Sequence, residues 1–313
     1  MGSWTLETIW WDRFDASKVD PEILRNIKAA ALVERNAQDY GVYLGRVFAD
    51  DAAFMESVNG WVVEEIQHGM ALGRWAQLAD PGWDFDAAFA RFRAGYRLPL
   101  EASASVRGSQ AGEMMARCIV ETGTSSYYSA LKDAALEPVL KQVCGKIAAD
   151  EFRHYKLFYE HLRRCLKRDR LSRWSRLRIG WGRLAESEDD ELAYAYFAAN
   201  EPADAVYDRK RSFRAYARRA YPLYRQTHVQ RAMAMVLKAI GLQPQGWLNG
   251  LLTRIGLWFL SRNAARLDVS VVPCVRNART SPFRSITTSR IERTATSTTS
   301  RAAAPFQMPT PVA

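Results

Sequence analysis

The chain has 313 residues, of which 48% are hydrophobic and 25% charged, and its formal net charge is +10 at pH 7. This length allows one large domain or two modest ones. The opening stretch, WTLETIWWDRF, carries charges throughout, so we expect no secretory signal and a cytoplasmic location. The cysteines show no paired spacing, which favours reduced thiols over a disulfide framework. They are Cys118, Cys144, Cys165 and Cys274.

Almost no period-2 alternation occurs before residue 265, and this predicts an all-α fold. Asp20-Pro21 marks the start of the first helix, because an acid caps a helix and proline suits its first position. Helix, short turn, helix, long crossover, helix, short turn and helix is the connectivity of ferritin-like bundles. We therefore expect a ferritin-like four-helix bundle. Its helices are expected at about 21–48, 54–79, 109–133 and 138–167, with the crossover at 80–106.

Additional C-terminal helices are expected after the bundle, at 190–223 and 225–264. The tail is Ser-, Thr-, Arg- and Pro-rich with few apolar residues, so we expect it to be disordered. The predicted parts are an N-terminal arm at 1–20, the bundle at 21–167, a basic helical extension at 168–264 and the tail at 265–313.

Basic residues concentrate in two runs, 163–183 and 208–221. Such runs are usually solvated helix faces, but an acidic protein partner or an anionic membrane also fits them, whereas nucleic acid is not the partner we expect. The segment 247–260 is strongly apolar, yet it is only fourteen residues long and contains Arg254. It is too short to span a bilayer, so it either packs on the bundle or lies on a membrane surface.

Glu151 and His154 share an apolar helical stripe with Ile147 and Phe158. Either polar residue alone on such a stripe is most often a satisfied core residue. The pair at i and i+3 aims both groups at one point and suits metal ligation. The second expected helix repeats this Glu-x-x-His pattern at 65–68, which makes coincidence the poorer explanation.

A further acid precedes each motif. Glu34 lies 31 residues before Glu65, and Glu121 lies 30 residues before Glu151. Two facing hairpins would therefore bring four carboxylates and two imidazoles together in the core. Burying these carboxylates without compensation is costly, and two divalent cations would neutralise them. The predicted ligands are Glu34, Glu65, His68, Glu121, Glu151 and His154.

Carboxylate and imidazole ligands without a thiolate favour iron, with manganese as the alternative. Two irons held in this way can bind dioxygen and perform a two-electron oxidation. The sequence therefore predicts a di-iron oxidoreductase. A structural metal clip is the competing interpretation.

Two acids, Glu64 and Asp150, immediately precede the motif glutamates. Each is expected to orient the histidine of the opposite hairpin, and a solvent-facing charge is the alternative. Thr124 stands where the other helices carry histidine, so its hydroxyl either serves a proton near bound oxygen or bonds to its own helix. Trp61, one turn before the first motif, is expected to pack rather than to relay electrons.

The stretches WVVEEIQHG (61–69) and CGKIAADEFRHY (144–155) resemble the two iron-binding motifs of the soluble acyl-ACP (acyl carrier protein) desaturases of the plant stearoyl-ACP type. The resemblance covers about residues 30–165. It implies a di-iron enzyme of fatty acid metabolism that takes electrons from a ferredoxin-like donor, activates dioxygen and desaturates an acyl chain. It also implies that the six residues above are iron ligands, with Thr124, Asp150 and Trp61 near the iron.

The resemblance has limits that leave the substrate open. Gln67 replaces the usual arginine of the first motif, Tyr155 replaces a polar residue of the second, and the chain after residue 165 matches nothing in the family. The acidic acyl carrier protein would suit the basic runs. Homodimers are common in the family, but no segment of this chain specifies an interface.

Two other functions compete with desaturation. The first is a di-iron oxygenase that hydroxylates or N-oxidises a small aromatic or amine, although N-oxygenases of this superfamily carry a histidine where this chain has Ile147. The second is a non-catalytic metal-binding or interaction protein, which predicts a bundle with no apolar channel to the metals. A tunnel beside Gly69, Gly73 and Gly112 would argue against that second function.

Overall fold

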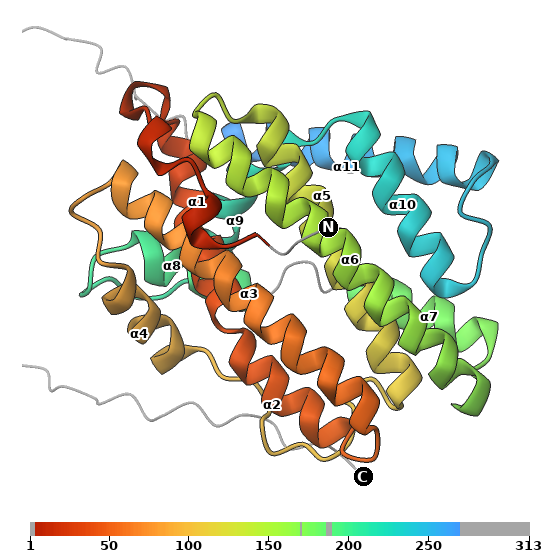
Figure 1. Cartoon of the computed structure of the whole chain (residues 1–313). Helices are drawn as coiled ribbons and strands as arrows, with labels where there is room; N and C mark the ends of the chain where they lie inside the picture. The colour runs from red at the N-terminus through yellow and green to blue at the C-terminus, as the bar shows by residue number, and fades with distance from the viewer. Residues whose placement is uncertain (1–3, 170, 186–189, 270–313) are drawn as a thin grey trace, which may run out of the picture. The chain divides into compact units, whose positions relative to one another are not determined.

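The computed structural model describes residues 4–169, 171–185 and 190–269, all within one compact unit (Figure 1). Every regular element among these residues is a helix, so the predicted all-α class is confirmed. Most of the predicted tail, residues 270–313, lies outside the described residues, as does Cys274.

The α-helices are α1 (Pro21–Arg35), α2 (Ala37–Val47), α3 (Ala52–Ala79), α4 (Phe85–Gly95), α5 (Gln110–Ala134), α6 (Pro138–Asp169), α7 (Arg173–Ala185), α8 (Asp190–Asn200), α9 (Arg209–Ala220), α10 (Gln226–Ile240) and α11 (Trp247–Val269). The 3₁₀ helices are η1 (Leu6–Thr8), η2 (Trp11–Arg13), η3 (Ala16–Lys18) and η4 (Tyr221–Leu223).

Two helical hairpins form the centre of this unit. Helix α1 packs on α3, α5 packs on α6, and the hairpins meet through α3 and α6 (Figure 1). The long connection between α3 and α5 carries α4. This order is compatible with a ferritin-like bundle.

Acidic and hydroxyl side chains set where these helices begin. Asp20 accepts hydrogen bonds from the backbone N–H groups of Glu22 and Ile23 at the start of α1. Glu137 accepts from the N–H of Leu140 at 2.7 Å and also from the indole of Trp75. These caps satisfy N–H groups that a helix end leaves free. They are the Asp-Pro and Glu-Pro signals that the sequence shows.

The ligand residues lie between two apolar clusters along the bundle. One cluster contains Trp75 of α3 and Ile147 of α6, and the other contains Trp61 and Phe158 of the same two helices. On α3 and α6, the Glu-x-x-His motifs therefore fall between apolar residues on both sides. Three cysteines of α5 and α6, Cys118, Cys144 and Cys165, are buried and free.

The first expected helix is in fact two helices. It breaks at Asn36, whose backbone lies near φ −80° and ψ 5°, so α1 ends at Arg35 and α2 begins at Ala37. Asparagine is a poor residue for a helix interior because its side chain competes for backbone hydrogen bonds. The break places Glu34 in the last turn of α1.

Three later predictions are also corrected. The crossover contains α4, whose Phe85 and Phe92 are buried. The expected helix at 190–223 is split into α8, α9 and η4. The expected helix at 225–264 is split into α10 and α11 by a turn with Gly241 at φ 84° and Gly246 at φ 123°, conformations that favour glycine. Helix α11 then continues past the predicted boundary, to Val269.

The N-terminal arm and the extension both pack on the bundle. Trp4 and Ile9 of the arm are buried, and the backbone N–H of Asp15 donates to Glu137 at 3.1 Å. Helix α8 packs on α1, and α10 packs on α5. Within the part of the chain that the structure describes, no helix is long and apolar enough to cross a bilayer.

Helices α1 and α3 approach closely at Gly69. A Cβ atom at this position would lie 2.5 Å from the backbone nitrogen of Arg35. The ring of Phe85 packs against Gly73 in the same way, and the backbone of Arg107 lies against Gly112. These glycines therefore serve close packing of the helices.

Candidate metal centre

All six predicted ligands converge in the middle of the bundle. Their candidate ligand atoms form two groups, and within each group these atoms lie within 4.8 Å of one another. Both groups share two carboxylates, and every member is at most 7% exposed. The first group is Glu34, Glu65, His68 and Glu151, and the second is Glu65, Glu121, Glu151 and His154.

The two shared carboxylates each turn one oxygen toward each histidine. Glu65 places Oε2 at 3.6 Å from Nδ1 of His68 and Oε1 at 3.0 Å from Nδ1 of His154. Glu151 places Oε1 at 3.2 Å from Nδ1 of His68 and Oε2 at 4.0 Å from Nδ1 of His154. Each of the two candidate groups thus contains both shared carboxylates together with one further Glu and one His.

Several buried ligand atoms have no hydrogen-bond partner. They include Nδ1 of both histidines, Oε2 of Glu121 and Oε1 of Glu151. Leaving such atoms unpaired in a core costs free energy, so they require an explanation. Two cations among these atoms would coordinate them and neutralise the four carboxylates. The donor set therefore fits a two-metal site.

The outer nitrogen of each histidine faces a carboxylate from the opposite hairpin. Nε2 of His68 lies 3.1 Å from Oδ2 of Asp150, and Nε2 of His154 lies 2.8 Å from Oε2 of Glu64. A proton held on Nε2 by these acids leaves the Nδ1 lone pair directed at the centre. As expected from the sequence, Glu64 and Asp150 each contact the histidine of the opposite hairpin.

Two residues that the sequence did not single out complete this outer layer. Arg153 pairs with Asp150 and places Nη1 at 3.3 Å from Oε1 of Glu64, so one guanidinium joins both acids. The indole of Trp4 donates to Asp150 at 2.7 Å, and its ring stacks on His68 with centroids 5.9 Å apart. Trp4 is 146 residues from its partner, and no local pattern marks such a contact.

Hydroxyl groups hold the ligands on the other side. Thr124 donates to Oε2 of Glu151 at 2.5 Å, and it also lies 3.3 Å from the carbonyl oxygen of Glu121 on its own helix. Tyr128 donates to Oε1 of Glu34 at 2.5 Å. Tyr128 lies two turns after Glu121 on the same stripe, a signal that could have revealed it.

Trp61 lies at the edge of the site, and the other two histidines of the chain, His161 and His228, do not join the ligands. Trp61 sits edge-on to His154, with ring centroids 6.5 Å apart, and packs on Phe158 at 5.5 Å. The ring of His161 packs on Phe54 instead of joining the ligands. His228 faces Asp133 at 3.1 Å and caps α10.

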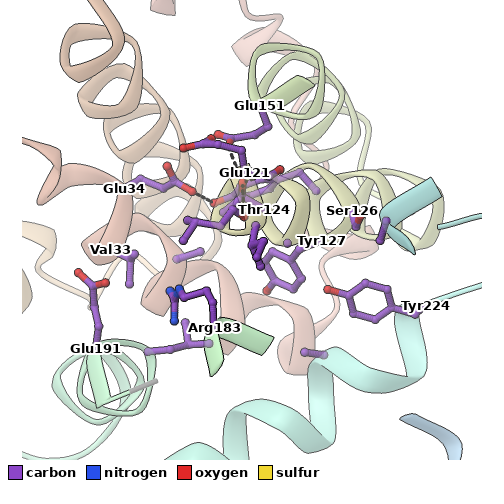
Figure 2. Close-up of a pocket in the computed structure, with 18 of the residues that line it drawn as sticks. Val33, Glu34, Glu121, Thr124, Ser126, Tyr127, Glu151, Arg183, Glu191 and Tyr224 are labelled. Carbon is purple, nitrogen blue, oxygen red and sulfur yellow. Dashed lines mark hydrogen bonds between the residues drawn. The ribbon is translucent and has the colours of Figure 1, made fainter. Parts of the chain in front are cut away.

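A cavity of about 500 Å³ reaches the carboxylate side of the centre (Figure 2). Its wall includes the four ligand carboxylates, Thr124 and Trp61, but neither ligand histidine. The rest of the wall is mainly apolar and aromatic and comes largely from α5, α9, α10 and α11. The extension after residue 168 therefore forms much of this cavity, which the sequence did not predict.

Protons and cations compete for this centre. Burial, and then the charge of Glu65, raise the pKa of Glu34 well above its usual value, and burial with the charge of Glu151 does the same for Glu121. Burial lowers the pKa of His154, but the close carboxylates of Glu64 and Glu65 outweigh burial and raise it to about 10. His154 is therefore protonated at neutral pH, and a cation that binds beside it would have to displace that proton.

The chain has no match among protein-family models and none among curated proteins. The likeness to desaturases therefore depends on the residues of the two motifs alone. What the structure shows is a buried set of carboxylates and imidazoles that can hold metal ions.

Replacing Asp150 with asparagine is expected to weaken metal binding about 10- to 100-fold, because His68 loses the charge that orients it. A competition titration with a chelator measures this change. Asp133→Asn is the matched control, since Asp133 faces His228 at the same 3.1 Å but far from the ligands. Equal weakening in both variants would show that Asp150 has no special role.

Proposed function

We propose that the protein is a di-iron oxidase that uses dioxygen to introduce a double bond into an acyl chain. One observation supports this most strongly: the ligand carboxylates form part of the wall of an apolar cavity. The cavity volume lies within the range of about 300–1,000 Å³ typical of small-molecule sites. A non-catalytic metal protein has no use for such an opening, so the cavity argues against that function.

Iron suits the proposed chemistry, and manganese is the alternative ion for the same donor set. When bound, two irons would support the reduction of dioxygen to two waters, with two electrons from the C–H bonds of the substrate and two from an external donor. The resemblance to desaturases suggests a ferredoxin-like protein as that donor. It also suggests an acyl carrier protein as the partner that presents the chain.

Residues of the cavity would position the substrate and keep water away. The cavity wall includes Ile119 and Val120 of α5 and Val229 and Met233 of α10, which favours an extended apolar chain. Thr124 holds one oxygen of Glu151 at the cavity edge, where its hydroxyl can pass a proton. The histidines, on the far side, keep their orientation through the outer acids.

The test is an aerobic reaction of the reduced, iron-loaded protein with acyl-ACP and with the free fatty acid. We expect dioxygen uptake together with an alkene product, detected by mass spectrometry. Metal-free protein is the control and should form no product. Iron-dependent dioxygen uptake that leaves every acyl substrate unchanged would contradict the proposal.

A hydroxylase of the same di-iron type is the second candidate. Polar residues, including Arg183 and Glu191, line the cavity away from the ligand carboxylates (Figure 2), so a substrate with a polar group also fits. The same assay separates the two reactions, because hydroxylation adds an oxygen atom and desaturation removes two hydrogens. N-oxygenation is less suited, since the position of its additional ligand holds the buried Ile147.

A further inference from the structure

Helix α11 has several large apolar side chains on its outer face. Trp247 is 79% exposed, Ile255 51% and Trp258 59%, and they lie at helical spacings of 8 and 3 residues on one stripe. The inner face carries the buried polar residues Asn249 and Thr253, which are joined by a hydrogen bond of 3.1 Å. Water is a poor solvent for the outer stripe, so this pattern indicates that something apolar covers it.

The chain segment that leads to this stripe and carries it is basic. No Asp or Glu occurs between Arg209 and Leu267, a stretch that holds twelve Arg and Lys. On α11 itself, Arg254, Arg262 and Arg266 are exposed, and the guanidinium of Arg262 lies 5.1 Å from the ring centroid of Trp258. A stripe of tryptophan and aliphatic residues flanked by arginines is typical of helices that lie in the interface of an anionic membrane.

The cavity reaches the surface at the same helix. Phe259 lines the cavity and is half exposed, and Gly256 and Leu260 also form part of its wall. Phe259 is adjacent to Trp258 in the outer stripe. An apolar molecule held against this stripe would therefore stand at the mouth of the cavity that leads to the ligand carboxylates.

Other occupants fit the stripe less well. A symmetric second copy would place the same patch against itself, and its arginines would then face arginines. An acidic carrier protein would pair with the arginines, but it would also have to bury two exposed tryptophans. A lipid surface satisfies both features at once, because its anionic headgroups bind the arginines and its acyl region accepts the tryptophans.

We propose that α11 lies on a lipid surface that contains anionic lipids, and that the apolar substrate enters the cavity from this surface beside Phe259. The part of this proposal that concerns substrate entry rests on the proposed oxidase function. The docking itself does not, because it involves no metal ligand. On this route the acyl chain would come from membrane lipid or from a fatty acid dissolved in the membrane, instead of from the acyl carrier protein that the resemblance suggests.

The test is co-sedimentation of the full chain with vesicles of phosphatidylcholine alone and of phosphatidylcholine mixed with phosphatidylglycerol. We expect binding to the mixed vesicles only. Trp247→Ala and Trp258→Ala should each lower the partition coefficient about tenfold, and Arg254→Gln and Arg262→Gln about fivefold each. Trp10→Ala is the matched control, because Trp10 is 50% exposed in the N-terminal segment.

Circular dichroism and metal content identify any variant that fails to fold. If the tryptophan variants do not fold, the arginine variants still test the proposal. Absence of binding to mixed vesicles, or binding that the α11 variants leave intact, would overturn the proposal. The proposal would also be overturned if the protein did not bind vesicles and the α11 variants instead disrupted a dimer or a complex with acyl carrier protein. Vesicle binding by protein that oxidises no substrate would refute the oxidase function and leave the docking in place.

Discussion

Glu151→Ala is expected to remove both metal ions from the centre. Glu151 belongs to both ligand groups, so its loss would remove one protein ligand from each metal position and weaken metal binding at both. The measurement is elemental analysis after loading with iron and removal of the free metal. Retention of both ions would contradict the two-metal arrangement.

Glu113→Ala is the matched control for that experiment. Glu113 is also a buried glutamate, 2% exposed, but its carboxylate accepts hydrogen bonds from Tyr43 and Ser105 at 2.8 Å. Its loss should lower the free energy of unfolding by about 1–3 kcal/mol, because it leaves buried donors unpaired, and should leave metal content unchanged. Glu151→Ala should instead lower the metal content and should not lower the free energy of unfolding of the metal-free protein, because it removes one of four crowded carboxylates. Thermal unfolding of both variants, with and without metal, separates the two effects.

Gly123→Leu is expected to lower kcat/KM for an acyl substrate by about 100-fold without loss of metal. Gly123 lines the cavity beside Thr124, and a Cβ atom there would meet no other atom within 4 Å. The leucine side chain would therefore extend into open space and occupy the part of the cavity nearest the ligands. Steady-state kinetics together with metal analysis measure both outcomes.

Gly60→Leu is the control for the cavity variant. Gly60 also has open space around its Cβ position, but it does not line the cavity. Activity of Gly60→Leu should match the unmodified protein. Full activity of Gly123→Leu would show that substrate does not use this cavity, and equal losses in both variants would show a general effect of helix substitution.

The helix classes and the ligand set were accessible from the sequence, because both follow from short-range periodicity. Glu65 with His68, and Glu151 with His154, are i and i+3 pairs on apolar stripes, and the repeat of the pattern locates Glu34 and Glu121. The structure brings all six together. Glu64 and Asp150 could be found because each immediately precedes a motif glutamate, and on these two helices that position lies toward the opposite hairpin.

The cavity and the outer contacts could not be predicted, because they depend on chain segments far apart in sequence. Trp4 contacts Asp150, which is 146 residues away in the sequence, and α10 and α11 contribute to the wall of a cavity that α5 also lines. The break after Glu34 was missed because the apolar spacing continues through Asn36 without a change of period. Helix α4 was missed because the crossover was treated as a connection, although Asp84 caps a helix there.

The contact at Gly69 has a consequence for how the centre can change during evolution. Gly69 follows His68 on α3, and it touches the backbone of Arg35, which follows Glu34 on α1. Glu34 and His68 are also the two ligands that belong to the first group alone. One added methyl group at position 69 would force these two apart while sparing Glu121 and His154. If the centre holds two ions, a single mutation at Gly69 would thus leave a site for one ion. The other ligand histidine, His154, is followed by Tyr155 and not by a glycine, so its helix has no equivalent close contact to disturb.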